Sequence, residues 1–193
     1  MEQISEKIMQ YVDEAYMLEE KERAILKFGI ESFLEIGINI IVSVILLCRL
    51  NMMLEGLIFF SIFIPVRAYS GGYHADTYFR CLIFSVLSLV IVMLTSNKLH
   101  IAMGISFVLI SWLLFLIWVI APVINAERPV SYLEYQRFTG KLRKILIIIE
   151  VLAGIITIFK FQRIANVLLL SLVLILISLI IGKIKYKNCQ VVK

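Results

Sequence analysis

The sequence predicts an all-α protein, a polytopic integral membrane helical bundle. The chain has 193 residues and is 61% hydrophobic and 17% charged, with a mean hydropathy of +0.96. Soluble domains are about 45–50% apolar and about 25% charged. The apolar residues also fall in long runs that have basic residues at their ends, as membrane anchoring requires. The formal net charge of +5 is therefore explained by membrane anchoring, and we expect no nucleic acid partner.

Residues 1–28 are predicted to form an N-terminal amphipathic segment at the cytosolic membrane interface. Apolar residues recur there at helical spacing, with Glu and Lys between them. They are Ile4, Ile8, Tyr11, Val12, Ala15 and Leu18. Such a helix either lies on the membrane and receives a partner or caps the spans from the cytosol. The charged start has no continuous apolar core, which argues against a cleavable signal peptide. We expect a transmembrane domain over 29–182 and a basic cytosolic tail over 183–193.

About six membrane segments are predicted, some of them short or re-entrant. The apolar runs cover residues 32–48, 52–66, 82–95, 101–121, 145–159 and 164–182. The second run is short for a crossing of about 20 residues. It reaches that length only if its helix takes in part of residues 67–70, after which Gly71 and Gly72 break the helix. We expect a charged loop over residues 127–144, between the fourth and fifth runs.

Basic residues alternate between the two sides of this predicted bundle. The N-terminal segment, the connections after the second and fourth runs, and the tail together hold 15 of the 19 Lys and Arg residues. The other three connections hold 4. The positive-inside rule therefore predicts a multi-pass protein of the cell membrane with both termini in the cytosol. It places the connection after the second run at the same cytosolic face.

That connection is a short polar stretch that contains the candidate site. His74 and Cys81 lie in it, seven positions apart. The thiolate is the nucleophilic form of cysteine, and a free cysteine is only a few per cent ionised near neutral pH. A neighbouring imidazole that accepts the thiol proton would generate the thiolate. Arg67 and Arg80 would add positive potential, and a helix N-terminus near Cys81 would favour the thiolate in the same way.

The spacing sets a condition on this pair. On a continuous helix, seven residues separate two side chains by about 10 Å along the axis, which is too far for a hydrogen bond. His74 must therefore lie on a loop that folds back after the Gly-Gly pair, while Cys81 lies in or near the next helix. Asp76 and Glu35 are rival candidates for the carboxylate that orients the imidazole. Alternatively, His74 and Cys81 are packing residues. Two ligands are too few for a metal site, so we expect no metal or cofactor.

A sequence pattern around this pair resembles that of a known family. The pattern R-x4-G-x-H-A-x5-C is formed by Arg67, Gly72, His74, Ala75 and Cys81. It resembles the accessory gene regulator B (AgrB) family, the membrane cysteine endopeptidases of Gram-positive quorum sensing. The resemblance extends over the whole chain, with its charged start and multiple spans. Ala121-Pro122 followed by Arg128-Pro129 is similar to the basic cytosolic loop of that family.

This resemblance implies a reaction. Family members remove the C-terminal tail of a small amphipathic AgrD-like propeptide and close a thiolactone or lactone ring. Cys81 would form the acyl-thioester, and His74 would act first as base and then as acid. The acidic tail of the propeptide would meet basic residues of this chain, namely Arg128, Lys141, Arg143 and Lys144. A second copy of the chain is a further partner that the resemblance implies, and the membrane character of the sequence implies contact with membrane lipids.

Two other classes of function stay open on the sequence. One is a small transporter or exporter, although the spans lack the paired intramembrane charges and broken helices typical of such proteins. The other is a non-enzymatic assembly or sensor subunit with His74 as a pH-responsive group. A covalent peptide adduct on Cys81 is predicted only by the peptidase hypothesis.

Overall fold

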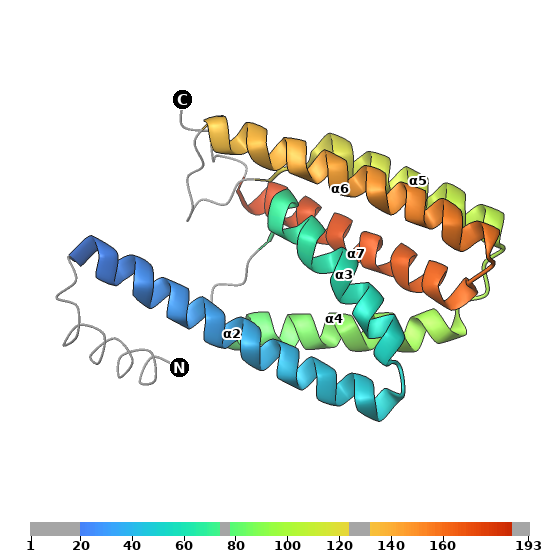
Figure 1. Cartoon of the computed structure of the whole chain (residues 1–193), viewed down its shortest axis with the longest axis horizontal. Helices are drawn as coiled ribbons and strands as arrows, with labels where there is room; N and C mark the ends of the chain where they lie inside the picture. The colour runs from blue at the N-terminus through green and yellow to red at the C-terminus, as the bar shows by residue number, and fades with distance from the viewer. Residues whose placement is uncertain (1–19, 74–77, 124–131, 187–193) are drawn as a thin grey trace.

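The described part of the chain is helical. The structure, a computed structural model, describes residues 20–73, 78–123 and 132–186. These contain six helices (Figure 1), which are α2 (Glu20–Leu50), α3 (Met53–Ser70), α4 (Tyr78–Lys98), α5 (Met103–Ile120), α6 (Tyr132–Ile158) and α7 (Gln162–Lys185). Within these ranges, the β-type pairing is an isolated bridge between Gly71 and Val123. The predicted all-α class is confirmed.

The helices have the length and surface of a membrane bundle. Four of them, Met53–Ser70, Phe79–Lys98, Met103–Ile120 and Gln162–Lys185, are long and apolar enough to cross a membrane, and α2 adds a shorter apolar stretch, Ile36–Leu50. Large apolar side chains are exposed along the outer faces, for example Leu57 (64%), Val108 (66%) and Val151 (59%). Soluble monomers rarely expose apolar patches this extensive. The chain is therefore a multi-pass membrane protein.

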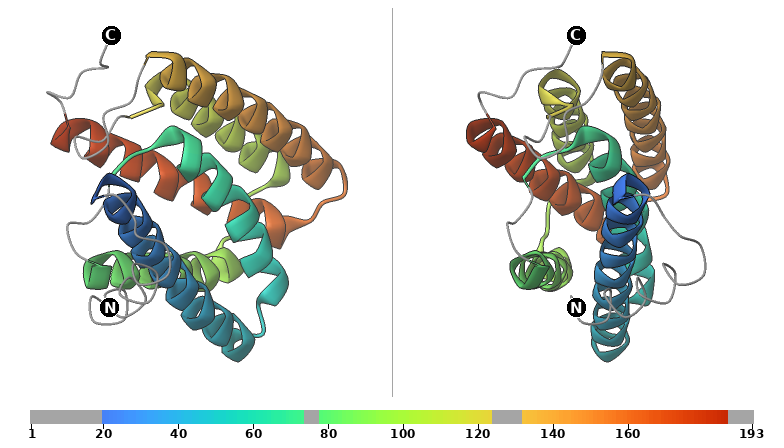
Figure 2. Two further views of the ribbon diagram at one scale, coloured as in Figure 1. Left: turned by 60° about the vertical axis from the view of Figure 1, so that its left-hand side comes forward. Right: turned by 90° about the vertical axis from the view of Figure 1, so that its left-hand side faces the viewer.

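Helix α7 is the central element of the bundle. It packs against α3, α4, α5 and α6, and two views show it between α5 and α4 (Figures 1 and 2). Half of the residues in its apolar stretch (50%) are buried inside the bundle, against 22–28% for the other three spans. Its buried face repeats every three or four residues, at Leu168, Leu172, Ile175 and Leu179. Because lipid tails are as apolar as these side chains, close packing rather than transfer from water stabilises this core.

A buried asparagine fixes the end of α4 to the start of α7. Asn166 is 1% exposed, and its Nδ2 donates to the carbonyls of Ser96 at 2.9 Å and Leu99 at 2.8 Å. Its Oδ1 accepts a hydrogen bond from Gln162 at 3.1 Å. The last carbonyls of a helix have no partner within it. Asn166 therefore satisfies two carbonyls at this end of the bundle that lipid cannot satisfy.

The end of α3 agrees with the sequence prediction. The helix runs past Pro65 to Ser70 and so takes in residues 67–70. Gly71 follows with a φ of +68°, and its amide donates to the carbonyl of Arg67. At the other boundary, α2 continues through residue 28 without a break. Residues 1–19 and the tail beyond Tyr186 lie outside the described residues.

The charged segment before the fifth apolar run differs from the prediction. We expected a loop over residues 127–144, but α6 begins at Tyr132, so that expectation was wrong for residues 132–144. The reason is that apolar residues continue inward at helical spacing through the charged segment. Leu142 is 1% exposed, and the Phe138 ring lies 6.1 Å from that of Tyr69. The basic residues of this segment occupy the outer face of the same helix.

Basic residues concentrate at one end of the bundle. Among the residues whose side chains the structure describes, this end collects the last turns of α3 and α7, the start of α4 and the first half of α6. It holds Arg67, Arg80, Arg137, Lys141, Arg143, Lys144, Lys183 and Lys185. The opposite end holds Arg49, Lys98, Lys160 and Arg163. The asymmetry read from the sequence is thus a property of the folded bundle. The positive-inside rule predicts that the basic end faces the cytosol.

Candidate active site

Residues 71–73, the turn that follows α3, are held by two other parts of the chain. The carbonyl of Ser70 accepts a hydrogen bond of 2.8 Å from the amide of Val123, just after α5. The amide of Tyr73 donates a hydrogen bond of 3.0 Å to the carbonyl of Ser178, in the last turns of α7. The turn is therefore fixed on both sides by backbone contacts with segments far away in the sequence.

The Gly-Gly pair permits this close packing. Gly71 and Gly72 have φ values of +68° and +115°, a region that favours glycine. A Cβ at Gly71 would overlap the carbonyl oxygen of Val123, and one at Gly72 would overlap the guanidinium of Arg67. The predicted helix break is confirmed. The structure adds that both glycines make room for neighbouring groups.

Arg67 bridges the turn with its guanidinium. Nη1 donates to the carbonyl of Gly71 and Nη2 to the carbonyl of Tyr73. The rigid fork of an arginine suits two such acceptors in a way that a lysine cannot reproduce. The same buried guanidinium lies within electrostatic range of Cys81 and of Tyr186. The sequence predicted positive potential from Arg67 near the cysteine, and the contacts show that Arg67 also fixes the backbone of the turn.

Cys81 lies at the start of α4, three residues after Tyr78. It is partly buried and is not in a disulfide. The break after α3 and the placement of Cys81 in the next helix agree with the condition that the spacing imposed. The unpaired amides in the first turn of a helix also carry partial positive charge.

The structure describes only some of the other predicted catalytic and supporting residues. His74 and Asp76 lie outside the described residues, as does the side chain of Glu35, which belongs to α2. Arg80 is exposed on α4 beside Cys81. The proximity of the imidazole to the thiol therefore stays a prediction. What the structure fixes is Tyr73, the residue immediately before His74.

Exposed basic residues surround the same end of the bundle. The ammonium of Lys141 lies 5.4 Å from the centre of the Tyr69 ring, and the guanidinium of Arg143 lies 5.0 Å from that of Trp118. The ammonium of Lys185 lies 4.9 Å from the Tyr73 ring. Lys144 is exposed on α6. Arg128 lies outside the described residues.

Comparison with known proteins gives one match. A family model described as accessory gene regulator B matches residues 5–181. The chain belongs to the AgrB family. That family is associated with AgrD processing for quorum sensing, and its members are generally cysteine protease-like processing enzymes. Comparison with curated proteins and with solved structures finds no match.

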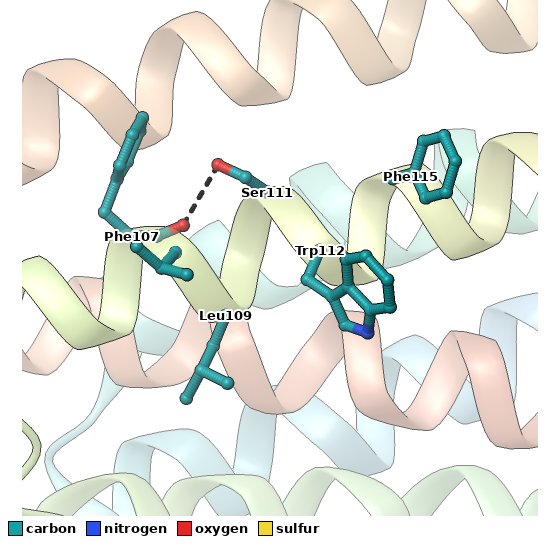
Figure 3. Close-up of a pocket in the computed structure, with 6 residues that line it drawn as sticks. Phe107, Leu109, Ser111, Trp112 and Phe115 are labelled. Atoms are coloured by element: carbon teal, nitrogen blue, oxygen red, sulfur yellow. Dashed lines mark hydrogen bonds between the residues drawn. The ribbon is translucent and has the colours of Figure 1, made fainter.

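The matched AgrB region contains a carboxylate within an apolar run that the sequence reasoning missed. Glu150 lies in the apolar half of α6, and the hydroxyl of Ser111 on α5 is 2.6 Å from its Oε1. The Ser111 hydroxyl also points at the carbonyl of Phe107, 3.0 Å away (Figure 3). A carboxylate within an apolar run was the available signal, because such a residue normally faces protein or water. This pair joins α5 to α6.

The pocket beside this pair is not part of the α3–α4 turn. It has a volume of about 420 Å³ and is lined by α5 residues, namely Phe107, Val108, Leu109, Ser111, Trp112 and Phe115 (Figure 3). Among the described residues of this AgrB protein, no group of three or more His, Cys, Asp or Glu is arranged to hold a metal ion.

Proposed function

We propose that this AgrB-family protein is a membrane cysteine endopeptidase that processes a small AgrD-like propeptide. Cys81 is the nucleophile and His74 the general base. The observation that carries the proposal is the position of Arg67. Its guanidinium donates to the carbonyl of Tyr73, one residue before His74, and lies near enough to Cys81 for its charge to act on a thiolate there. One side chain thus acts on both ends of the short stretch that the two catalytic residues delimit.

The first half of the reaction cleaves the propeptide. The imidazole of His74 takes the thiol proton, and the sulfur of Cys81 attacks the scissile carbonyl carbon to form a C–S bond. The C–N bond then breaks, and the imidazolium gives its proton to the departing amine of the tail. The products are the tail with a free amino terminus and an acyl-thioester on Cys81. The positive charge of Arg67 near the sulfur favours the attacking thiolate.

The second half closes the ring. A thiol or hydroxyl within the bound peptide attacks the thioester carbonyl, the new C–S or C–O bond forms, and the bond to Cys81 breaks. The sulfur of Cys81 leaves as a thiolate and recovers the proton of the attacking group. No water is consumed, so a site shielded from water favours ring closure over hydrolysis. The partly buried position of Cys81 at the end of an apolar bundle supports this outcome.

The decisive experiment is replacement of the nucleophile. The full chain is co-expressed in membranes with a propeptide tagged at its C-terminus, and release of the tail is measured by mass spectrometry. Cys81→Ala and His74→Ala are expected to abolish release, and Cys48→Ala to retain it. Cys48 is the matched control because it is exposed and lies in the last turn of α2. Undiminished release by Cys81→Ala would end the proposal.

The same experiment separates the peptidase from the alternative functions. A propeptide that lacks its internal nucleophile cannot close the ring, so the acyl-thioester on Cys81 should accumulate as a covalent adduct. A transporter or a sensor subunit predicts no such adduct. Substrate flux that survives in Cys81→Ala would favour the transporter, and signalling that survives would favour the sensor subunit.

The basic end of the bundle is the proposed contact for the acidic tail of the propeptide. The propeptide's amphipathic helix would lie in the membrane interface beside it. We expect Lys141→Gln, Arg143→Gln and Lys144→Gln together to raise KM about threefold or more and to weaken its salt dependence, with little change in kcat. The control is a Lys160→Gln, Arg163→Gln double variant at the opposite end. An unchanged KM in the triple variant would contradict this contact.

A further inference from the structure

The last turns of α7 touch the backbone that leads to His74. The carbonyl of Ser178 accepts the hydrogen bond from the amide of Tyr73. One turn later, Gly182 is buried against the same two residues of the turn, Gly72 and Tyr73. After almost another turn, the ammonium of Lys185 lies over the Tyr73 ring. Three successive positions on one face of α7 therefore contact the turn.

Gly182 is the closest of these contacts. A Cβ at this position would lie 2.7 Å from the carbonyl carbon of Gly72, 2.7 Å from the amide nitrogen of Tyr73 and 2.8 Å from the Cα of Gly72. All three atoms belong to the backbone, so no side-chain rotation can relieve the overlap. Ordinary contact begins at 3.4 Å, which means that a methyl group at 182 must displace the turn or the helix by about 0.7 Å.

A glycine at this position weakens the helix. Glycine in a helix interior is less favourable than alanine, and α7 continues beyond Gly182 to Lys185. By contrast, a Cβ at Gly104 or Gly140 would meet nothing within 4 Å. At Gly56, in α3, the close atoms belong to the Leu47 side chain, whereas at Gly182 they belong to the backbone of the turn. This backbone contact gives a physical reason for a glycine that the helix itself does not favour.

We infer that the end of α7 is a positioning platform for the catalytic histidine, with Gly182 as its key residue. This inference rests on the proposed function. Gly182 acts through Gly72 and Tyr73, the two described residues that immediately precede residue 74 in the chain. An imidazole must reach the thiol within hydrogen-bond distance. A misplacement of about 1 Å at a catalytic group costs about 10²-fold in rate, so a displacement of the size that a methyl group enforces is sufficient to impair catalysis.

The test is Gly182→Ala in the full-length protein, reconstituted in lipid vesicles with the tagged propeptide. We expect kcat for tail release to fall by about 10- to 100-fold while KM stays near its wild-type value. Gly140→Ala, at the same end of the bundle, and Gly104→Ala, at the opposite end, are the controls and should keep wild-type kcat. A purely structural effect would instead lower the thermal unfolding midpoint and the amount of protein in the membrane.

A second readout needs no propeptide. In a Cys48→Ala, Cys189→Ala background, Cys81 is the remaining thiol, and its alkylation by iodoacetamide is followed against pH. His74→Ala should remove the fast reaction at neutral pH, and Gly182→Ala should reproduce the profile of His74→Ala. A wild-type profile and a wild-type kcat in Gly182→Ala would overturn the inference, as would an equal loss of kcat in Gly140→Ala.

Failure of the proposed function gives a different pattern. In that case Cys81→Ala still releases the tail, whatever the behaviour of Gly182→Ala. If Gly182→Ala does not reach the membrane, Lys185→Gln replaces it, because this variant removes the charge over Tyr73 and leaves the glycine intact. It should lower kcat severalfold, and wild-type kcat in this variant would overturn the inference.

Discussion

Replacement of Arg67 gives the sharpest quantitative test of the α3–α4 turn. Its guanidinium donates two hydrogen bonds, one to the carbonyl of Gly71 and one to that of Tyr73. A hydrogen bond from a charged donor contributes about 1.5–3 kcal/mol. Lysine keeps the charge but cannot present the fork, so Arg67→Lys should lose one of the two. If the whole free energy of that hydrogen bond is lost from the transition state because His74 is misplaced, kcat decreases roughly 10- to 150-fold.

The assay compares kcat for tail release by Arg67→Lys, Arg67→Ala and wild type in lipid vesicles. Arg67→Ala should lose more than Arg67→Lys, and added guanidinium ion should restore part of its activity by occupying the vacated position. Arg49→Ala, at the exposed end of α2, is the matched control. Wild-type kcat in Arg67→Ala would show that the turn holds its shape without this side chain, and the reasoning about Arg67 would be refuted.

Three further predictions address the bundle and the turn. Asn166→Leu leaves two carbonyls without donors and should destabilise the protein by about 1–3 kcal/mol, seen as a lower unfolding midpoint in detergent, with cleavage retained at low temperature. Ser111→Ala removes one interhelical hydrogen bond to Glu150 and should cost about 0.6 kcal/mol and at most about 1.7; an unchanged midpoint would count against that bond. Gly71→Ala forces a side chain onto a φ of +68° and into the carbonyl oxygen of Val123, so tail release should fall at least about tenfold, and full release would contradict the described contact.

The parts of the fold that were predictable follow local rules. Runs of apolar residues gave the helices, and the Gly-Gly pair marked the end of α3, because a helix break depends on a few neighbouring residues. The length of α6 was predictable in principle. Phe138 and Leu142 continue its apolar period, but the density of charge around them favoured a loop. Hydrophobic periodicity was the better guide than net polarity in this segment.

The parts that could not be predicted depend on contacts between distant segments. Nothing near Arg67 in the sequence indicates that its guanidinium binds the carbonyls of Gly71 and Tyr73. The contacts of Gly182 with Gly72 and Tyr73 join residues about 110 positions apart, which no local pattern reports. Glu150 was visible as a carboxylate in an apolar run, but its partner Ser111 becomes evident only when α5 and α6 are packed together.

The central place of α7 has a consequence for biosynthesis. Of the described helices it is the last to leave the ribosome, yet half of its apolar stretch is buried among helices made before it. The earlier helices must therefore enter the membrane before their packing partner is present. Their inward faces are covered only when residues 162–185 are inserted. Until then the carbonyl of Ser178 is missing for the amide of Tyr73. A chain that stops before α7 would lack this contact, so the turn before residue 74 is fixed only after α7 has entered the bundle.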